Sequence, residues 1–145
     1  MPIELSIHDD LPPDAADVVD RSLDEANDAA GVLQDVKPLS AFVRDGGRVV
    51  GGAVGRTWGE CCELQQLWID AAYRRRGLGE RLLRGFEQRA AERGCTLVYL
   101  TTFSFQAPAF YEGRGYRVVH ELRGYAHGVR KFTMSRQIGA HAPTP

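Results

Sequence analysis

The chain has 145 residues, a formal net charge of −1 at pH 7 and a hydrophobic fraction of 43%, values typical of one globular domain. A charge near zero argues against nucleic-acid binding, which normally requires a basic domain. The sequence shows no apolar run near the ~20 residues of a membrane helix and no signal-peptide pattern. Its three cysteines lack disulfide or metal-ligand spacing, which favours a reduced, cytoplasmic setting without a metal site.

The first half of the chain predicts one strand, one helix and then three strands. The first strand rests on alternating apolar residues, and the helix on a proline-led segment with helical apolar periodicity. A D-G-G turn predicts that two of the later strands form a hairpin, and glycines in its second strand indicate a bulge. The strands are expected at 3–7, 39–44, 48–57 and 61–69, and the helix has Pro12 and Pro13 in its first turn and runs as far as Gly31.

The second half predicts two more helices and three more strands. Leu82, Leu83, Phe86 and Ala90 recur at the spacing that places them on one helix face. The pattern as a whole predicts a mixed α/β (α+β) fold, with a mostly antiparallel sheet of about six to seven strands flanked by about four helices. The helices are expected at 80–93 and 107–112, the strands at 96–102, 116–123 and 130–138, and a frayed tail at 139–145.

A short turn rich in arginine and glycine joins the strand ending at Ile69 to the helix that begins near Glu80. The first amides of a helix have no internal partner and point outward together, and the macrodipole adds about half a positive charge there. Three consecutive arginines, Arg74 to Arg76, add donors suited to phosphate. The turn therefore predicts a site for a phosphate-bearing ligand.

Two motifs carry a resemblance to a known family. Arg74 to Gly79 reads R-x-x-G-x-G, whereas the nucleotide P-loop and the dinucleotide fingerprint are absent. Together with the "LWID" strand before it and the leucine-rich helix after it, this resembles the acyl-CoA pyrophosphate loop of the GCN5-related N-acetyltransferases (GNAT). The family also carries N-x-x-A-x-x-[FL]-Y-x-x-x-G-[FY], which this chain matches at Ala107, Phe110, Tyr111, Gly115 and Tyr116, with Ser104 in place of the asparagine.

The resemblance implies one GNAT domain over residues 1–138 that transfers acetyl from acetyl-CoA to a primary amine by direct attack in a ternary complex. It implies that the motif strand pairs with the pantetheine arm, that the following amides hold the pyrophosphate, and that a backbone N–H near Ile69 meets the oxyanion. The residues expected at the cofactor are Leu67, Trp68, Ile69, Arg74, Arg75, Arg76, Gly77, Leu78, Gly79, Glu80 and Ser104.

Acetyl transfer needs a group that takes a proton from the amine and a donor for the departing thiolate. The resemblance assigns the donor to Tyr111, and a positioned donor is typically worth ~10²–10⁴ in rate. The resemblance also makes Glu63 the candidate base, because some members of the family place a glutamate base at this point of the strand. In a regular strand, Glu63 and Gln65 project from one face, the face that also carries Leu67 and Ile69. Glu60 and a water relay through Gln65 remain as alternatives.

The only indication of the acceptor's chemistry is the distribution of charged residues along the chain. Residues 9–28 are strongly acidic and residues 74–93 carry seven arginines, which favours a small cationic amine as acceptor. Alternatives are a non-catalytic acyl-CoA-binding module, transfer of another acyl group, and a protein N-terminus as acceptor. The resemblance also allows a homodimer, and neither nucleic acid nor membrane is expected as a partner.

Overall fold

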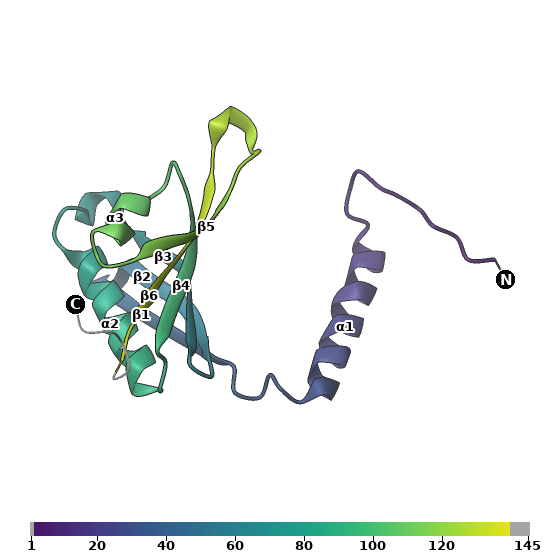
Figure 1. Cartoon of the computed structure of the whole chain (residues 1–145), viewed down its shortest axis with the longest axis horizontal. Helices are drawn as coiled ribbons and strands as arrows, with labels where there is room; N and C mark the ends of the chain where they lie inside the picture. Colours follow the sequence, from purple (N-terminus) through teal and green to yellow (C-terminus); the bar gives the residue numbers. More distant parts are fainter. Residues whose placement is uncertain (1, 140–145) are drawn as a thin grey trace. The chain divides into compact units, whose positions relative to one another are not determined.

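The computed structural model describes residues 2–139, which form two compact units divided after Gln34 (Figure 1). The first unit contains helix α1 (Pro13–Ala30), which confirms the predicted helix. A proline occupies its first turn, where the missing N–H costs no helical hydrogen bond. The helix ends where the Gly31 N–H donates to the Asp28 carbonyl at 3.1 Å.

The predicted strand at residues 3–7 is wrong, because this segment forms neither helix nor strand. Ile3, Leu5 and Ile7 are each at least 88% exposed. Alternating apolar residues favour an extended chain, but a strand exists only where a neighbouring strand satisfies its backbone groups. Sequence pattern alone does not supply that neighbour.

The second unit is built on one sheet of six strands in the order β1-β2-β3-β4-β6-β5. All neighbours are antiparallel except β3 and β4, which confirms the predicted mixed fold. The described residues hold three α-helices rather than about four, plus two single turns of 3₁₀ helix. The bounds are β1 (Lys37–Asp45), β2 (Arg48–Trp58), β3 (Cys61–Ile69), α2 (Leu78–Glu92), β4 (Leu97–Phe103), α3 (Pro108–Glu112), β5 (Arg117–Leu122) and β6 (Lys131–Gln137), with 3₁₀ turns at Ala71–Tyr73 and Ala126–Gly128.

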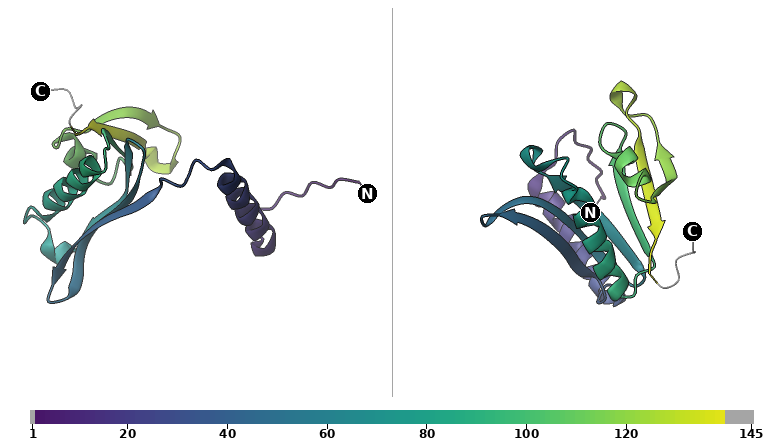
Figure 2. Two further views of the ribbon diagram at one scale, coloured as in Figure 1. Left: turned by 90° about the horizontal axis from the view of Figure 1, so that it is seen from below. Right: turned by 90° about the vertical axis from the view of Figure 1, so that its left-hand side faces the viewer.

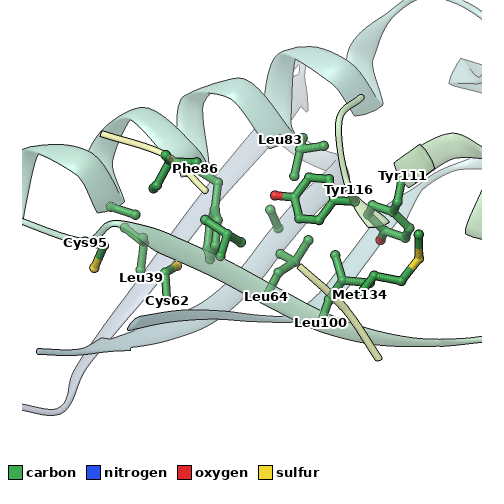
Figure 3. Packing of buried hydrophobic residues seen from close by; sticks show 14 of the residues in the cluster. Leu39, Cys62, Leu64, Leu83, Phe86, Cys95, Leu100, Tyr111, Tyr116 and Met134 are labelled. Carbon is green, nitrogen blue, oxygen red and sulfur yellow. The ribbon is translucent and has the colours of Figure 1, made fainter. Parts of the chain in front are cut away.

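Helix α2 packs its predicted apolar face on the sheet. Leu82, Leu83, Phe86 and Ala90 are all buried, and they meet strand side chains in one core (Figure 3). Burying a leucine or phenylalanine side chain contributes roughly 1.5–3 kcal/mol, so this one helix face accounts for much of the core's stability. It also anchors the helix N-terminus beside the end of β3.

A buried carboxylate joins α2 to the distal part of the unit. Glu87 is only 5% exposed, and its oxygens accept from Tyr116 Oη at 2.7 Å and Arg84 Nη1 at 2.8 Å. Arg136 Nη1 lies 3.0 Å from the same carboxylate. A buried charge is tolerated only when paired and hydrogen-bonded, so this cluster fixes how α2 sits against Tyr116 and β6.

The sheet separates between β3 and β4. The two strands pair in parallel only at Cys61–Leu97, Cys62–Val98 and Glu63–Tyr99, and beyond these pairs the two halves of the sheet diverge (Figure 2). A bulge in β3 lies at the same level: Gly55 pairs with Leu64 and Val54 with Gln66, which leaves Gln65 as the extra residue. Bulges bend a strand and increase its twist, which turns the end of β3 away from β4.

The bulge predicted in β2 lies at Val50, which is skipped between the pairs Val43–Gly51 and Arg44–Val49. Gly55 instead lies opposite the bulge in β3. A Cβ at Gly55 would lie 1.9 Å from the Glu63 carbonyl oxygen and 2.9 Å from the Phe86 ring. Such distances forbid any side chain, so the close approach of the two strands requires glycine. The local glycine thus permits the bend that opens the sheet.

Candidate active site

Two cavities meet where β3 and β4 diverge. Their volumes are about 520 Å³ and about 620 Å³. The larger contains the arginine- and glycine-rich turn, and the smaller is lined by residues of β1, β2, β3 and β4. They are called the cofactor cleft and the acceptor cavity, after the roles proposed for them below. Five residues line both of them: Leu67, Trp68, Gln106, Ala107 and Tyr111.

The cofactor cleft gathers most of the residues predicted to bind the cofactor. Arg76 is not among its lining residues; its guanidinium lies over the Tyr73 ring at 5.1 Å. Ser104 is also absent from the lining. The predicted residues that line the cleft are Leu67, Trp68, Ile69, Arg74, Arg75, Gly77, Leu78, Gly79 and Glu80.

The turn presents backbone donors to the cleft. Gly77 caps α2 with φ 75°, a left-handed conformation that favours glycine. The first intrahelical hydrogen bond runs from Arg81 N to Gly77 O at 3.1 Å, so the amides of Leu78, Gly79 and Glu80 have no helical partner. Arg74 Nε donates to the Ile69 carbonyl at 3.1 Å and ties the turn to β3. These outward-pointing amides are the feature from which the sequence analysis predicts an anion site.

The carboxylate of Glu80 is balanced by two arginines. Arg84 and Arg114 lie 3.9 Å and 3.7 Å from its oxygens, so its charge does not stand alone beside the helix N-terminus. Arg114 also lies over the Phe110 ring at 3.9 Å and lines the cleft. Sequence reasoning missed both Arg114 and Phe110 as cleft residues, although Phe110 stands within the matched motif.

Tyr111 lies at the junction of the two cavities. It belongs to α3, is 7% exposed, and packs its ring edge-on against Phe110 at 5.2 Å. Its ring also lies edge-on to Tyr116 at 5.7 Å (Figure 3). Within residues 2–139 its hydroxyl makes no hydrogen bond, and burial alone raises the pKa of Tyr111. The phenol therefore keeps its proton at neutral pH and has it free to donate.

The prediction that Glu63, Gln65, Leu67 and Ile69 share one face of β3 is wrong. Because Gln65 is the bulged residue, Glu63 shares a face with Gln66 and Trp68, opposite Arg56, Val54 and Gly52 on β2. Glu63 lines neither cavity; its Oε1 accepts from Arg56 Nε at 3.0 Å. Gln65 and Gln66 both line the acceptor cavity, and only Gln65 was expected near the reaction.

Ser104 fastens two strands rather than facing either cavity. Its hydroxyl accepts from the Arg130 N–H at 3.0 Å, at the start of β6. The amide side chain at the cleft belongs instead to Gln106, whose Oε1 accepts from Phe103 N at 2.9 Å. Gln106 lines both cavities, a position that no pattern in the sequence indicated.

Residues 2–139 contain no cluster of three or more histidine, cysteine or carboxylate side chains that could hold a metal ion. Across the same range no helix is long and apolar enough to cross a membrane.

A sheet that divides at its one parallel pair, with a glycine-rich turn and helix N-terminus at the division, defines the acetyltransferase class of fold. The chain belongs to the acetyltransferase (GNAT) family, whose model matches residues 5–116. Blasticidin-S acetyltransferase of Streptomyces morookaense is 32% identical over 111 residues, which cover 73% of this chain and 82% of that protein.

Solved structures agree on the fold. The crystal structure of an acetyltransferase from Bacillus cereus matches with a TM-score of 0.74 and 26% identity, covering 92% of this chain and 98% of that one. An aminoglycoside 6'-N-acetyltransferase complexed with coenzyme A matches with a TM-score of 0.64 and 21% identity, over 83% of this chain and 81% of that one. The second match, at its low identity, speaks to the fold alone.

Proposed function

We propose that this acetyltransferase moves an acetyl group from acetyl-CoA to the primary amine of a small molecule by direct attack in a ternary complex. The observation that carries the proposal is the position of Tyr111, whose side chain lines both cavities and whose hydroxyl is unpaired within residues 2–139. A thioester entering from one side and an amine entering from the other would meet beside that hydroxyl.

The cofactor cleft suits an acyl-CoA in two ways. The unpaired amides at the start of α2, with Arg74 and Arg75, suit the pyrophosphate. The β3 edge from Leu64 to Ile69 has no pairing with β4, so it can hydrogen-bond an extended pantetheine arm as another strand would. Gln106 lines the cleft and would present its side-chain amide to that arm, whereas Ser104 does not line the cleft.

In the chemical step the amine nitrogen attacks the thioester carbonyl, the C–N bond forms and the C–S bond breaks. The oxyanion accepts from backbone N–H on β3 near Ile69. The hydroxyl of Tyr111 donates to the departing sulfur, and the nitrogen releases its proton to a base. The proton returns through water to Tyr111, so the net products are an amide and a free thiol.

We assign the base to Glu63 acting through water. It lies on the same face of β3 as Gln66, so a chain of waters along the acceptor cavity would connect it to the amine. Its Oε1 accepts from Arg56 Nε at 3.0 Å, which holds the carboxylate in place. Glu63→Gln is expected to lower kcat about tenfold or more without changing the affinity for acetyl-CoA; an unchanged kcat would leave the water relay through Gln65 as the proton path.

The experiment that tests the proposal has two parts. Calorimetry with CoA and acetyl-CoA measures cofactor binding, and release of free thiol in the presence of an amine measures transfer. Blasticidin S belongs among the amines tested because of the named relative. Binding with amine-dependent thiol release supports the proposal. Binding without release from any amine indicates an acyl-CoA-binding module, and the absence of binding refutes the cofactor assignment.

A further inference from the structure

The acceptor cavity has a floor whose chemistry selects among amines. Phe42, Gly52 and Trp68 stand opposite one another on β1, β2 and β3, and all three line the cavity. We call this row the aromatic shelf. Phe42 is 50% exposed and Trp68 51% exposed, although large aromatic side chains normally gain by burial.

Gly52, in the middle of the row, leaves room for the ring of Phe42. A Cβ at Gly52 would lie 2.9 Å and 3.1 Å from two carbons of the Phe42 ring, so that ring leans over the glycine. The strands are about 4.8 Å apart, which places the Phe42 and Trp68 backbones about two such spacings from each other. Two partly exposed aromatic side chains thus flank Gly52 and present ring surface to the cavity.

The walls of the cavity are uncharged. Among the described residues, those that line it include no lysine, arginine, aspartate or glutamate. Beside the shelf, the guanidinium of Arg44 adds a positive charge 5.9 Å from the Phe42 ring centroid. A polycationic acceptor would lose water there without gaining a counter-charge, which is costly. The amides of Gln65 and Gln66 supply neutral donors and acceptors instead.

We propose that the acceptor is an amine carrying a planar, uncharged aromatic or heteroaromatic ring, which lies on the aromatic shelf while the amino group reaches toward Tyr111. This inference rests on the proposed function, because it assumes that the acceptor cavity holds the amine. Base-like rings stack on aromatic side chains with substantial energy, and the glutamine amides match the polar edge of a heteroaromatic ring.

A matched pair of amines tests the inference. Phenethylamine and its cyclohexyl analogue share the same chain and amino group, and differ in whether the ring is flat. With kcat/KM expressed per neutral amine, the planar compound is expected to react at least tenfold faster, and spermidine to react more slowly than either. Phe42→Leu is expected to remove the preference for the planar ring while the KM for acetyl-CoA stays the same.

The control is Trp58→Phe. Trp58 is 49% exposed on β2 and does not line either cavity, so its replacement is expected to leave the preference intact. This variant retains Trp68 as its one tryptophan, so its fluorescence reports directly on ring binding. The planar amine should quench it at concentrations where the cyclohexyl analogue does not.

The results separate the two proposals. Transfer without a planar preference, or with faster reaction of spermidine, overturns the inference and leaves the acetyltransferase activity standing. An unaltered preference in Phe42→Leu also overturns it. Failure of acetyl-CoA to bind overturns the proposed function, and the inference with it.

Discussion

Replacing Tyr111 by phenylalanine removes one oxygen atom and keeps the ring. The ring's edge-on contacts with Phe110 and Tyr116, at 5.2 Å and 5.7 Å, depend on carbon atoms alone. The hydroxyl has no hydrogen-bond partner within residues 2–139, so the free energy of unfolding should change by no more than about 0.5 kcal/mol. Loss of the proton donor should lower kcat about 100-fold, equivalent to about 2.7 kcal/mol in the activation barrier.

Tyr116→Phe is the matched control, because it removes the same atom from the neighbouring ring. The Tyr116 hydroxyl donates to buried Glu87 at 2.7 Å, and a hydrogen bond to a charged group is worth about 1.5–3 kcal/mol. This variant should therefore lose several degrees of Tm, and its kcat at a temperature where it is folded should fall much less than that of Tyr111→Phe.

Thiol release at saturating acetyl-CoA, calorimetry for cofactor affinity and thermal melts measure the three quantities for each variant. Burial raises the pKa of Tyr111 above its ordinary value of 10.0, so ionisation of this group should not lower the wild-type rate below pH 10. A Tyr111→Phe enzyme with wild-type kcat and intact cofactor affinity would refute the assignment of the donor. A loss of activity that followed only from a lower Tm would refute it as well.

Three further outcomes are expected. Gly77→Ala, at φ 75°, should lower the free energy of unfolding by about 1–2 kcal/mol and weaken CoA binding in calorimetry; unchanged values would contradict the left-handed cap. Burial raises the pKa of Cys62 to about 12 from 9.0, so the folded state holds this proton more tightly. The stability that this thiol contributes is fully present below pH 9 and is lost as the pH rises toward 12. Between those pH values the free energy of urea unfolding should fall less in Cys62→Ala than in the wild type. An equal fall in both proteins would contradict the assignment of this pH dependence to Cys62. Leu83→Ala, at a fully buried position, should cost about 2–5 kcal/mol in urea unfolding, whereas Val119→Ala, at a site 53% exposed, should cost less than about 0.5 kcal/mol.

The glycine-rich turn and α2 follow from local sequence. The spacing of Leu82, Leu83, Phe86 and Ala90 predicts the buried face, which the structure confirms. A helix start and a left-handed glycine depend on a few adjacent residues, so the turn at Gly77 was also predictable. The same holds for β3, whose observed bounds, Cys61–Ile69, equal the predicted ones.

The predictions that failed concern features that depend on residues far apart in the chain. The alternation at residues 3–7 suggested a strand, but no described strand pairs with it. Ser104 was assigned to the cofactor by motif position, whereas its hydroxyl bonds to Arg130, 26 residues away. Gln106 could not have been selected in its place, because nothing in its neighbours shows that it lines two cavities.

The sequence by itself therefore determined the fold class, the family and the glycine-rich turn before α2, since each depends on short runs of residues whose backbone preferences are local. Only the tertiary structure decided which side chains share a cavity. The register of β2 against β3 makes Gln65 the extra residue, so Glu63 lies on the face of Gln66 and Trp68 rather than that of Leu67 and Ile69. Strand pairing has a period of two, so a shift of one residue moves every later side chain to the opposite side, and the position of such a shift is set by the partner strand.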